Sequence, residues 1–235
     1  MTIRSLNLSA KTAATLFLIF VIAATASSVI LLGLGLSGEK KGLVVPTVSQ
    51  IKNKYTTSAL VGSMRGSMYE FVTADEDIEL VEEWVKNGHK KEDPLYEDVS
   101  EIIKLDCTNC HSRTSTMTRA IPSMPFESYE DIVVHVDAGY SWKQMSKQAH
   151  IHMYGIAMFL IIVALLFAYS TYAQWVRMGL IVSAFGAGFL DIFSWWFSKY
   201  ITELVYLIFI MGSIMVGSIL LMSVLVLVDM WRKEA

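Results

Sequence analysis

Four long apolar runs most constrain what this chain can fold into. A helix needs about 20 mostly apolar residues to cross a hydrocarbon core of about 30 Å. Three runs contain no Asp, Glu, Lys or Arg: 12–36, 151–176 and 204–228. The fourth, 178–198, contains Asp191, which is costly in lipid unless it faces the bundle interior or the headgroups. The sequence therefore predicts an all-α membrane protein with four transmembrane helices, one N-terminal and three C-terminal.

The composition supports a membrane protein and argues against a nucleic-acid-binding protein. Hydrophobic residues make up 54% of the 235 residues, which is above the usual share in soluble domains. The net charge is -3, and the sequence has no basic stripe of the kind that nucleic-acid-binding proteins show. We expect membrane partners and no nucleic acid.

The basic residues beside the runs predict the orientation. Positive side chains are enriched in short cytoplasmic flanks. The short flanks carry Arg4, Lys11, Arg177, Arg232 and Lys233. We therefore expect a multi-pass protein of a bacterial inner membrane with both termini in the cytoplasm and the long middle segment on the periplasmic side.

The first run is predicted to be an uncleaved anchor. Small residues at 24–26 resemble a signal-peptide cleavage site, but the apolar run continues beyond them to Leu36. The predicted domains are an anchor with its cytoplasmic end at 1–36, an extracytoplasmic helical domain at 37–150 and a three-span bundle at 151–235.

The middle segment is predicted to be helical. Pro46 can open a helix that continues to about Thr73, and Pro94 can open the helix that leads into the cysteines. Asp75 and Asp77 suit the start of a helix that ends at Gly88. A further helix is predicted from the sequence SYED to about Val136.

Both cysteines of the chain lie in the sequence DCTNCHSR, residues 106–113. Two cysteines separated by two residues and followed directly by histidine form the pattern for covalent attachment of c-type haem. In that chemistry Cys107 and Cys110 form thioethers to the porphyrin, and His111 is the axial ligand of the iron. The predicted cofactor is one covalent haem c.

Three other interpretations of the motif fit the sequence less well than haem attachment. An outward-facing compartment permits a Cys107–Cys110 disulfide, but so short a loop adds little restriction to the unfolded chain. A thioredoxin-like site would require a surrounding βαβ pattern, which the sequence lacks. A zinc site would require a fourth ligand besides the two cysteines and His111.

The segment around the motif resembles membrane-anchored monohaem c-type cytochromes. The sequence PLYEDVSEIIKLDCTNCH is followed by the polar stretch RTSTMTRAIPSMP and then by SYEDIVVHV. In the similar domains the haem motif ends one helix, and a polar loop leads to a helix that starts with Ser-Tyr-Glu-Asp. The resemblance covers about 50 of the 235 residues.

The sixth iron ligand has four candidates. His150 and His152 lie where the second span enters the membrane, in one continuous helix predicted from Ser141 onward. Two residues apart, they point about 200° away from each other, so one of them could reach a haem while the other meets another partner. They could equally be interfacial histidines. Met117 and Met124 lie in the loop after the motif, where a ligand distorts no helix.

Three functions fit these features. The first is one-electron transfer by a monohaem cytochrome, as an electron carrier or a subunit of a larger respiratory or redox complex, with other redox subunits or a soluble cytochrome as partners. The second is a quinol-oxidising subunit, with a quinone or proton site at Asp191 and Glu203. The third is a haem-based sensor, which would need a separate signalling partner because the predicted cytoplasmic parts are short.

Overall fold

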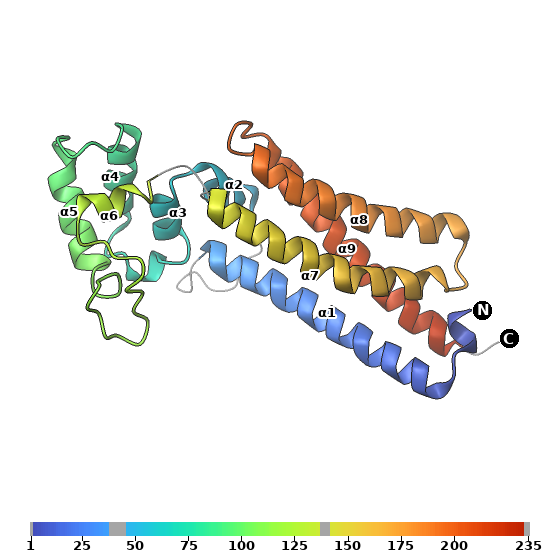
Figure 1. The fold of residues 1–235 in the computed structure, drawn as a ribbon. Helices are drawn as coiled ribbons and strands as arrows, with labels where there is room; N and C mark the ends of the chain where they lie inside the picture. The colour runs from blue at the N-terminus through green and yellow to red at the C-terminus, as the bar shows by residue number, and fades with distance from the viewer. Residues whose placement is uncertain (1, 38–45, 137–141, 233–235) are drawn as a thin grey trace. The chain divides into compact units, whose positions relative to one another are not determined.

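The computed structural model describes residues 2–37, 46–136 and 142–232, and within these segments every regular element is a helix (Figure 1). Four helices are long and apolar enough to cross a membrane: α1 (Leu8–Ser37), α7 (Trp142–Ala168), α8 (Gln174–Phe197) and α9 (Leu204–Trp231). This confirms the prediction of an all-α chain with one N-terminal and three C-terminal spans.

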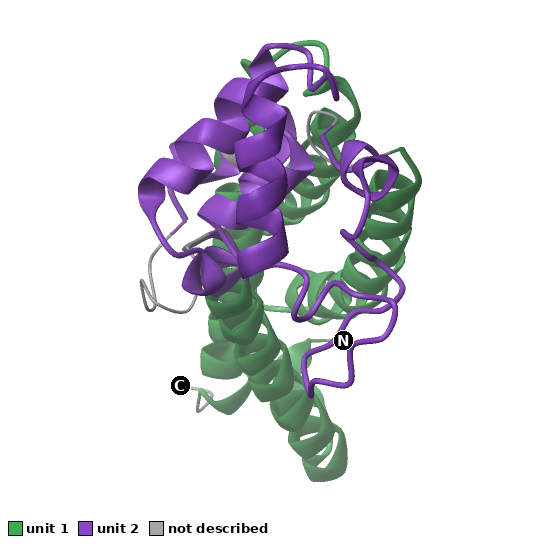
Figure 2. Ribbon diagram, turned by 90° about the vertical axis from the view of Figure 1, so that its left-hand side faces the viewer, with its two compact units in different colours: residues 1–31, 142–235 green, residues 32–141 purple. Residues whose placement is uncertain are grey.

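The chain divides into two compact units (Figure 2). Residues 1–31 and 142–235 form the first, called the membrane unit below. Residues 32–141 form the second, called the motif unit because it contains Cys107, Cys110 and His111. The membrane unit resumes at Trp142, where α7 begins, ahead of the apolar run that starts at Ile151.

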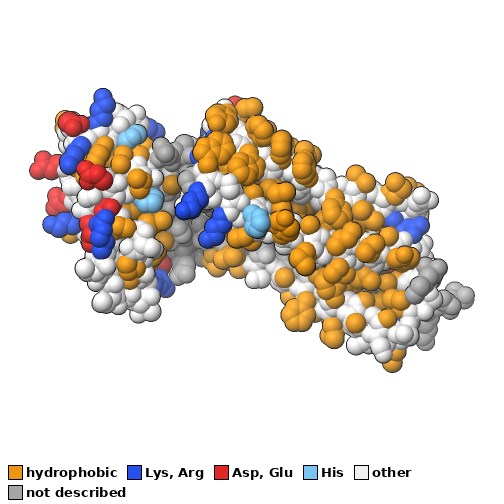
Figure 3. Space-filling view, viewed as in Figure 1, with side chains coloured by type: hydrophobic (Ala, Val, Ile, Leu, Met, Phe, Trp, Pro, Cys, Tyr) orange, Lys and Arg blue, Asp and Glu red, His pale blue; other side chains and the backbone are white. Residues whose placement is uncertain are grey.

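Within the membrane unit, α9 packs along α8 and also against α7. Its buried core takes Leu18 from α1, Phe167 from α7, Ala184 from α8 and Met222 from α9. Most of the remaining apolar side chains point outward, and Figure 3 shows them covering the middle of this unit with few charges among them. Such a surface suits lipid, because a membrane gives apolar side chains no reason to turn inward.

The second span ends earlier than predicted. The apolar run continues to Val176, but α7 ends at Ala168 and α8 begins at Gln174. The backbone N–H of Thr171 donates to the Asp229 carboxylate at 2.7 Å, and the Arg177 guanidinium donates to the Ala168 carbonyl. These two side chains stabilise a turn that hydropathy does not indicate.

Asp229 also connects the N-terminus to this turn. Its carboxylate accepts from Arg4 Nε at 2.9 Å, Arg4 Nη2 at 2.6 Å and Thr171 Oγ1 at 2.7 Å. The short helix η1 (Ile3–Ser5) donates from Ile3 N to the Tyr169 carbonyl at 2.8 Å. The N-terminus, the α7–α8 turn and the end of α9 therefore lie at the same end of the bundle, as the predicted topology requires.

The motif unit consists of short helices. These are α2 (Val48–Thr56), α3 (Ala59–Arg65), η3 (Tyr69–Phe71), α4 (Asp75–Lys86), α5 (Leu95–Asp106) and α6 (Tyr129–Val133). The helix predicted from Pro46 to Thr73 is wrong as a single element. Ser58 breaks it, because its hydroxyl accepts from Val61 N and caps α3.

The other predicted helix starts are confirmed. In α4 the Asp77 carboxylate accepts from Ala74 N at 3.1 Å, and Gly88, with φ +95°, lies just beyond the helix end. Ser128 and Asp131 form a capping box at the start of α6, although this helix ends at Val133 instead of Val136. These helices pack around a core that includes Trp84 and Ile103.

Candidate functional site

The two cysteines and the histidine lie within one turn at the end of α5. The backbone N–H of Cys110 donates to the Cys107 carbonyl at 3.1 Å, and that of His111 donates to the same carbonyl at 2.8 Å. Both cysteines are free thiols. Burial, together with the charges of Asp106 and Cys110, raises the pKa of the Cys107 thiol to about 12. This thiol is therefore protonated at neutral pH, unlike the attacking thiol of a disulfide oxidoreductase.

His111 is held in one orientation. Its ring is only 7% exposed and stacks on Phe126 with centroids 4.5 Å apart and planes 10° apart. Its Nδ1 lies 2.8 Å from the backbone carbonyl of Met124. Because a carbonyl only accepts, Nδ1 is the donor, and in the neutral form of the ring Nε2 has the lone pair. Metal-binding histidines show this arrangement, with the other ring nitrogen donating to a carbonyl or carboxylate.

The loop after the motif folds back onto it. Ile121 N donates to the Cys110 carbonyl at 2.9 Å, and Phe126 N donates to the His111 carbonyl at 2.8 Å. These bonds fix the position of the Met124 carbonyl, which lies between them in the sequence. The fold of the loop therefore determines that Nδ1 of His111, and not Nε2, contacts the protein backbone.

An ion-pair cluster, called the Arg113 clamp below, closes the base of this loop. Arg113 Nη1 lies 2.6 Å from Glu127 Oε2, and Nη2 lies 2.7 Å from Asp131 Oδ1. Ser112 Oγ donates to Glu127 Oε1 at 2.6 Å. Hydrogen bonds from Ser112 and Arg113 lower the pKa of the Glu127 carboxyl, and Arg113 lowers that of Asp131. The clamp therefore joins the residues just after His111 to the start of α6.

The four candidates for a sixth ligand fall in different units. Met117 is 55% exposed in the loop, and Met124 is partly buried against the core of the motif unit. His150 and His152 lie on α7 in the membrane unit and have different neighbours, as their spacing predicted. The ring of His150 contacts Tyr154 of its own helix, whereas that of His152 lies 5.1 Å from the ring of Trp195 on α8.

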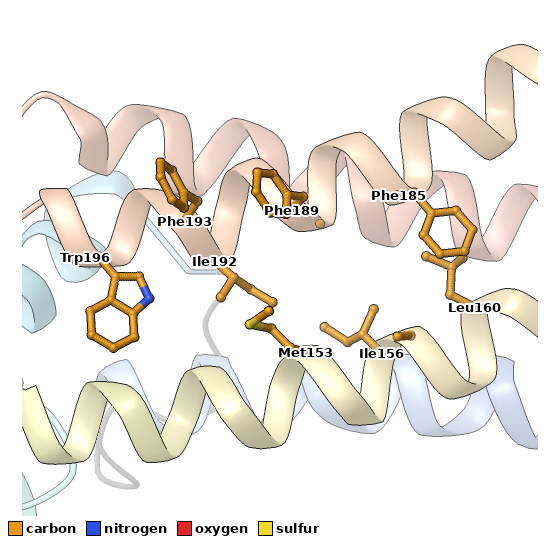
Figure 4. A pocket seen from close by; sticks show the side chains of 10 residues that line it. Met153, Ile156, Leu160, Phe185, Phe189, Ile192, Phe193 and Trp196 are labelled. Atoms are coloured by element: carbon orange, nitrogen blue, oxygen red, sulfur yellow. The ribbon is translucent and has the colours of Figure 1, made fainter.

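The candidate quinone or proton residues do not lie together. Asp191 is 7% exposed and accepts from Trp195 Nε1 at 3.3 Å. Its carboxylate points toward α9, where a Cβ added at Gly212 would lie 3.7 Å from Oδ1. Glu203 is exposed and directly precedes α9. The groove of the membrane unit has neither residue in its lining and runs instead between α7 and α8, from Trp196 to Leu160 (Figure 4).

Sequence reasoning missed two supports of His111. Phe126 packs on the imidazole, and the Met124 carbonyl orients it. His135, on another side of Phe126 with centroids 5.3 Å apart, is partly buried, and this burial together with nearby His111 lowers its pKa. A backbone acceptor leaves no signal in the sequence. An aromatic residue shortly after the motif is a signal, but a weak one.

The donor set fits a c-type haem better than a bare metal ion. Two unpaired thiols and a histidine with Nε2 left as acceptor are the groups that haem attachment requires, in the required order. In the described parts of the chain, no three His, Cys, Asp or Glu side chains are grouped so that they could hold a metal ion. The burial of His111 means that the loop must move aside for a porphyrin to reach Nε2.

Comparison with known proteins covers only the C-terminal part. Residues 136–235 match a family model described as a transmembrane helical domain. No curated protein and no solved structure matches the chain. The match and the four apolar helices support a multi-pass membrane protein, and the motif lies outside the matched residues.

Proposed function

We propose that this protein is a membrane-bound monohaem c-type cytochrome that transfers single electrons at the outer face of a bacterial inner membrane, as part of a larger redox complex. The observation that carries the proposal is the arrangement of His111. Its Nδ1 donates to the Met124 carbonyl, and this leaves Nε2 for iron one residue after the second cysteine.

Each residue of the candidate site would have its own role in holding the haem. Cys107 and Cys110 would hold the porphyrin edge, and His111 would supply one axial nitrogen. Phe126 keeps the imidazole plane fixed. The hydrogen bond to the Met124 carbonyl raises the basicity of Nε2, which makes it a better electron-pair donor to iron. A bound haem supplies a one-electron redox centre, and the protein tunes it through ligation, hydrogen bonding and burial. The membrane unit would anchor this centre at the bilayer surface.

The candidates for a sixth ligand would remain Met117, Met124, His150 and His152. The two methionines lie in the loop that follows the motif, whereas the two histidines lie on α7.

A pyridine haemochrome spectrum tests the proposal. The full chain is produced in bacteria able to mature cytochromes c, purified in detergent and extracted with acid acetone, which removes haem b but leaves thioether-linked haem. We expect a c-type spectrum with one haem per chain. The double variant Cys107→Ala/Cys110→Ala should lose all extraction-resistant haem.

The matched control changes the two residues between the cysteines. Thr108→Ala/Asn109→Ala keeps the pattern and should retain haem at the wild-type level. Circular dichroism of all three proteins checks that the spans are still helical. Absence of a c-type spectrum from the wild type would contradict the proposal, because the thiols would then have no role as haem attachment points.

A further inference from the structure

The groove between α7 and α8 combines apolar walls with one polar group. It has a volume of about 210 Å³, and Met153 and Ile156 of α7 face Ile192 and Trp196 of α8 across it, while Phe189 and Phe193 line its α8 side (Figure 4). Gly188 also lines the groove, and it lets α8 approach α9 closely, because a Cβ there would lie 2.9 Å from Met215 Sδ. The groove lies within two helices that can span a membrane, so a ligand can enter it from lipid.

The polar group is the indole N–H of Trp196. Figure 4 shows this nitrogen on the side of the ring that faces Ile192 and Met153, inside the groove. Among the described residues it has no acceptor. By contrast, Trp195 donates to Asp191 at 3.3 Å and Trp231 donates to Thr15 at 3.0 Å. Trp196 is partly buried near the end of α8, and its free N–H is available to donate to an acceptor that a ligand brings.

We propose that this groove binds the ring of an isoprenoid quinone. A quinone presents carbonyl oxygens at the edge of a flat ring, and one of them would accept the Trp196 hydrogen bond. One face of the ring would pack against the Met153 thioether, which is a favourable neighbour for aromatic systems, and the Phe189 and Phe193 rings would line the α8 side of the site. The isoprenoid tail would leave along the lipid-facing surface. Drug-sized ligands occupy about 300–1,000 Å³, so the smaller groove suits a single ring system.

The aromatic lining favours a quinone over the ester carbonyl of a phospholipid. A phospholipid ester could also accept from Trp196, but its saturated chain makes no stacking contacts. Phe189 and Phe193 already stack on each other with planes 15° apart, and Trp196 completes the aromatic side of the groove. The proposal concerns binding alone. It does not depend on haem, so it and the proposed function can fail separately.

Equilibrium binding of decylubiquinone to the purified full-length chain in detergent tests the proposal. Ala157 lines the groove and is exposed, so Ala157→Phe should fill the space and weaken binding at least tenfold. Trp196→Phe keeps an aromatic wall but removes the donor, and the loss of one neutral hydrogen bond should weaken binding about three- to tenfold. Two independent variants protect the test against one that fails to fold.

Each variant has a matched control on the same helix. Met158→Phe adds an aromatic ring beside Ala157 but outside the groove, and Trp175→Phe removes an exposed indole from the other end of α8. Both should bind as the wild type does. Equal binding by all five proteins would overturn the proposal. So would displacement of the quinone by an equimolar phospholipid, because the groove would then be a lipid site.

Discussion

The two units place their charges in opposite ways. In the motif unit, Arg113 and its partners Glu127 and Asp131 lie near the surface and pair there. In the membrane unit, Asp229 is only 2% exposed and meets the partly exposed Arg4 and Thr171 at one end of the bundle. Water screens the first cluster and leaves it worth little, whereas the second is shielded and costly to break. The motif unit must therefore depend mainly on its apolar core, whereas in the membrane unit shielded polar contacts add to the packing of its own apolar core.

The strongest test of this contrast removes the centre of the motif unit. Trp84 is fully buried, its ring lies 5.5 Å from that of Tyr96, and its Nε1 donates to the Lys90 carbonyl at 3.0 Å. Trp84→Ala should destabilise this unit by about 3–5 kcal/mol, the usual range for deleting a buried aromatic side chain. Limited trypsin digestion of the full chain should then cut within residues 46–136 at a lower temperature while the spans stay intact.

The control for this prediction is Trp84→Phe. It keeps most of the packing and loses the hydrogen bond to Lys90, so its effect should be clearly smaller. Loss of helicity in the spans of Trp84→Ala would show that the two units do not unfold separately, and the contrast between them would fail.

The second prediction breaks the polar contacts of the membrane unit. Asp229→Asn removes the charge that Arg4 and Thr171 share, and it should destabilise this unit by about 3 kcal/mol, the lower end for breaking a buried pair. Arg4→Lys keeps the charge but loses the two-pronged contact, so its cost should be lower. Thermal unfolding in detergent, followed by circular dichroism, measures both. Equal stability of Asp229→Asn and the wild type would contradict a structural role for this contact.

Sequence predicted best the features that depend on one local pattern. Three spans followed from uncharged runs and the fourth from an apolar run with the single charge of Asp191, and the starts of α4 and α6 followed from Asp77 and Ser128. The end of α7 could not be predicted, because Thr171 is held by Asp229 from a distant part of the chain. In the same way, the motif identified the candidate site, but the contact of His111 with the Met124 carbonyl depends on the folding of the loop between them.

The groove was beyond sequence reasoning for a different reason. Met153, Phe193 and Trp196 are ordinary residues for a membrane span, and only packing brings them to one space. Asp191 drew attention because a charge in a span is unusual, yet it contacts Trp195 and faces α9. A charged residue in a span is easy to find in a sequence. A cavity lined by common apolar residues is not, because it depends on how the helices pack.

The smallest predicted effect concerns the Arg113 clamp, where the contrast can be sharpened with pH. Arg113 and neighbouring hydrogen bonds lower the folded-state pKa of Glu127 and Asp131 below the usual values of 4.5 and 3.8. A lowered folded-state pKa contributes stability that is present above the unfolded-state value and is lost as the pH falls through the folded-state value. Arg113→Gln should therefore lower the unfolding temperature of the motif unit slightly at pH 7, and this difference should shrink as the pH falls below the usual values and vanish below the lowered folded-state pKa of both carboxyls. High salt should reduce the difference at pH 7, because the clamp is exposed and screened.

The same pH and salt series on Asp229→Asn should leave the difference from the wild type much less sensitive to salt, since Asp229 is buried. If both variants respond to salt equally, the two clusters do not differ in their access to water.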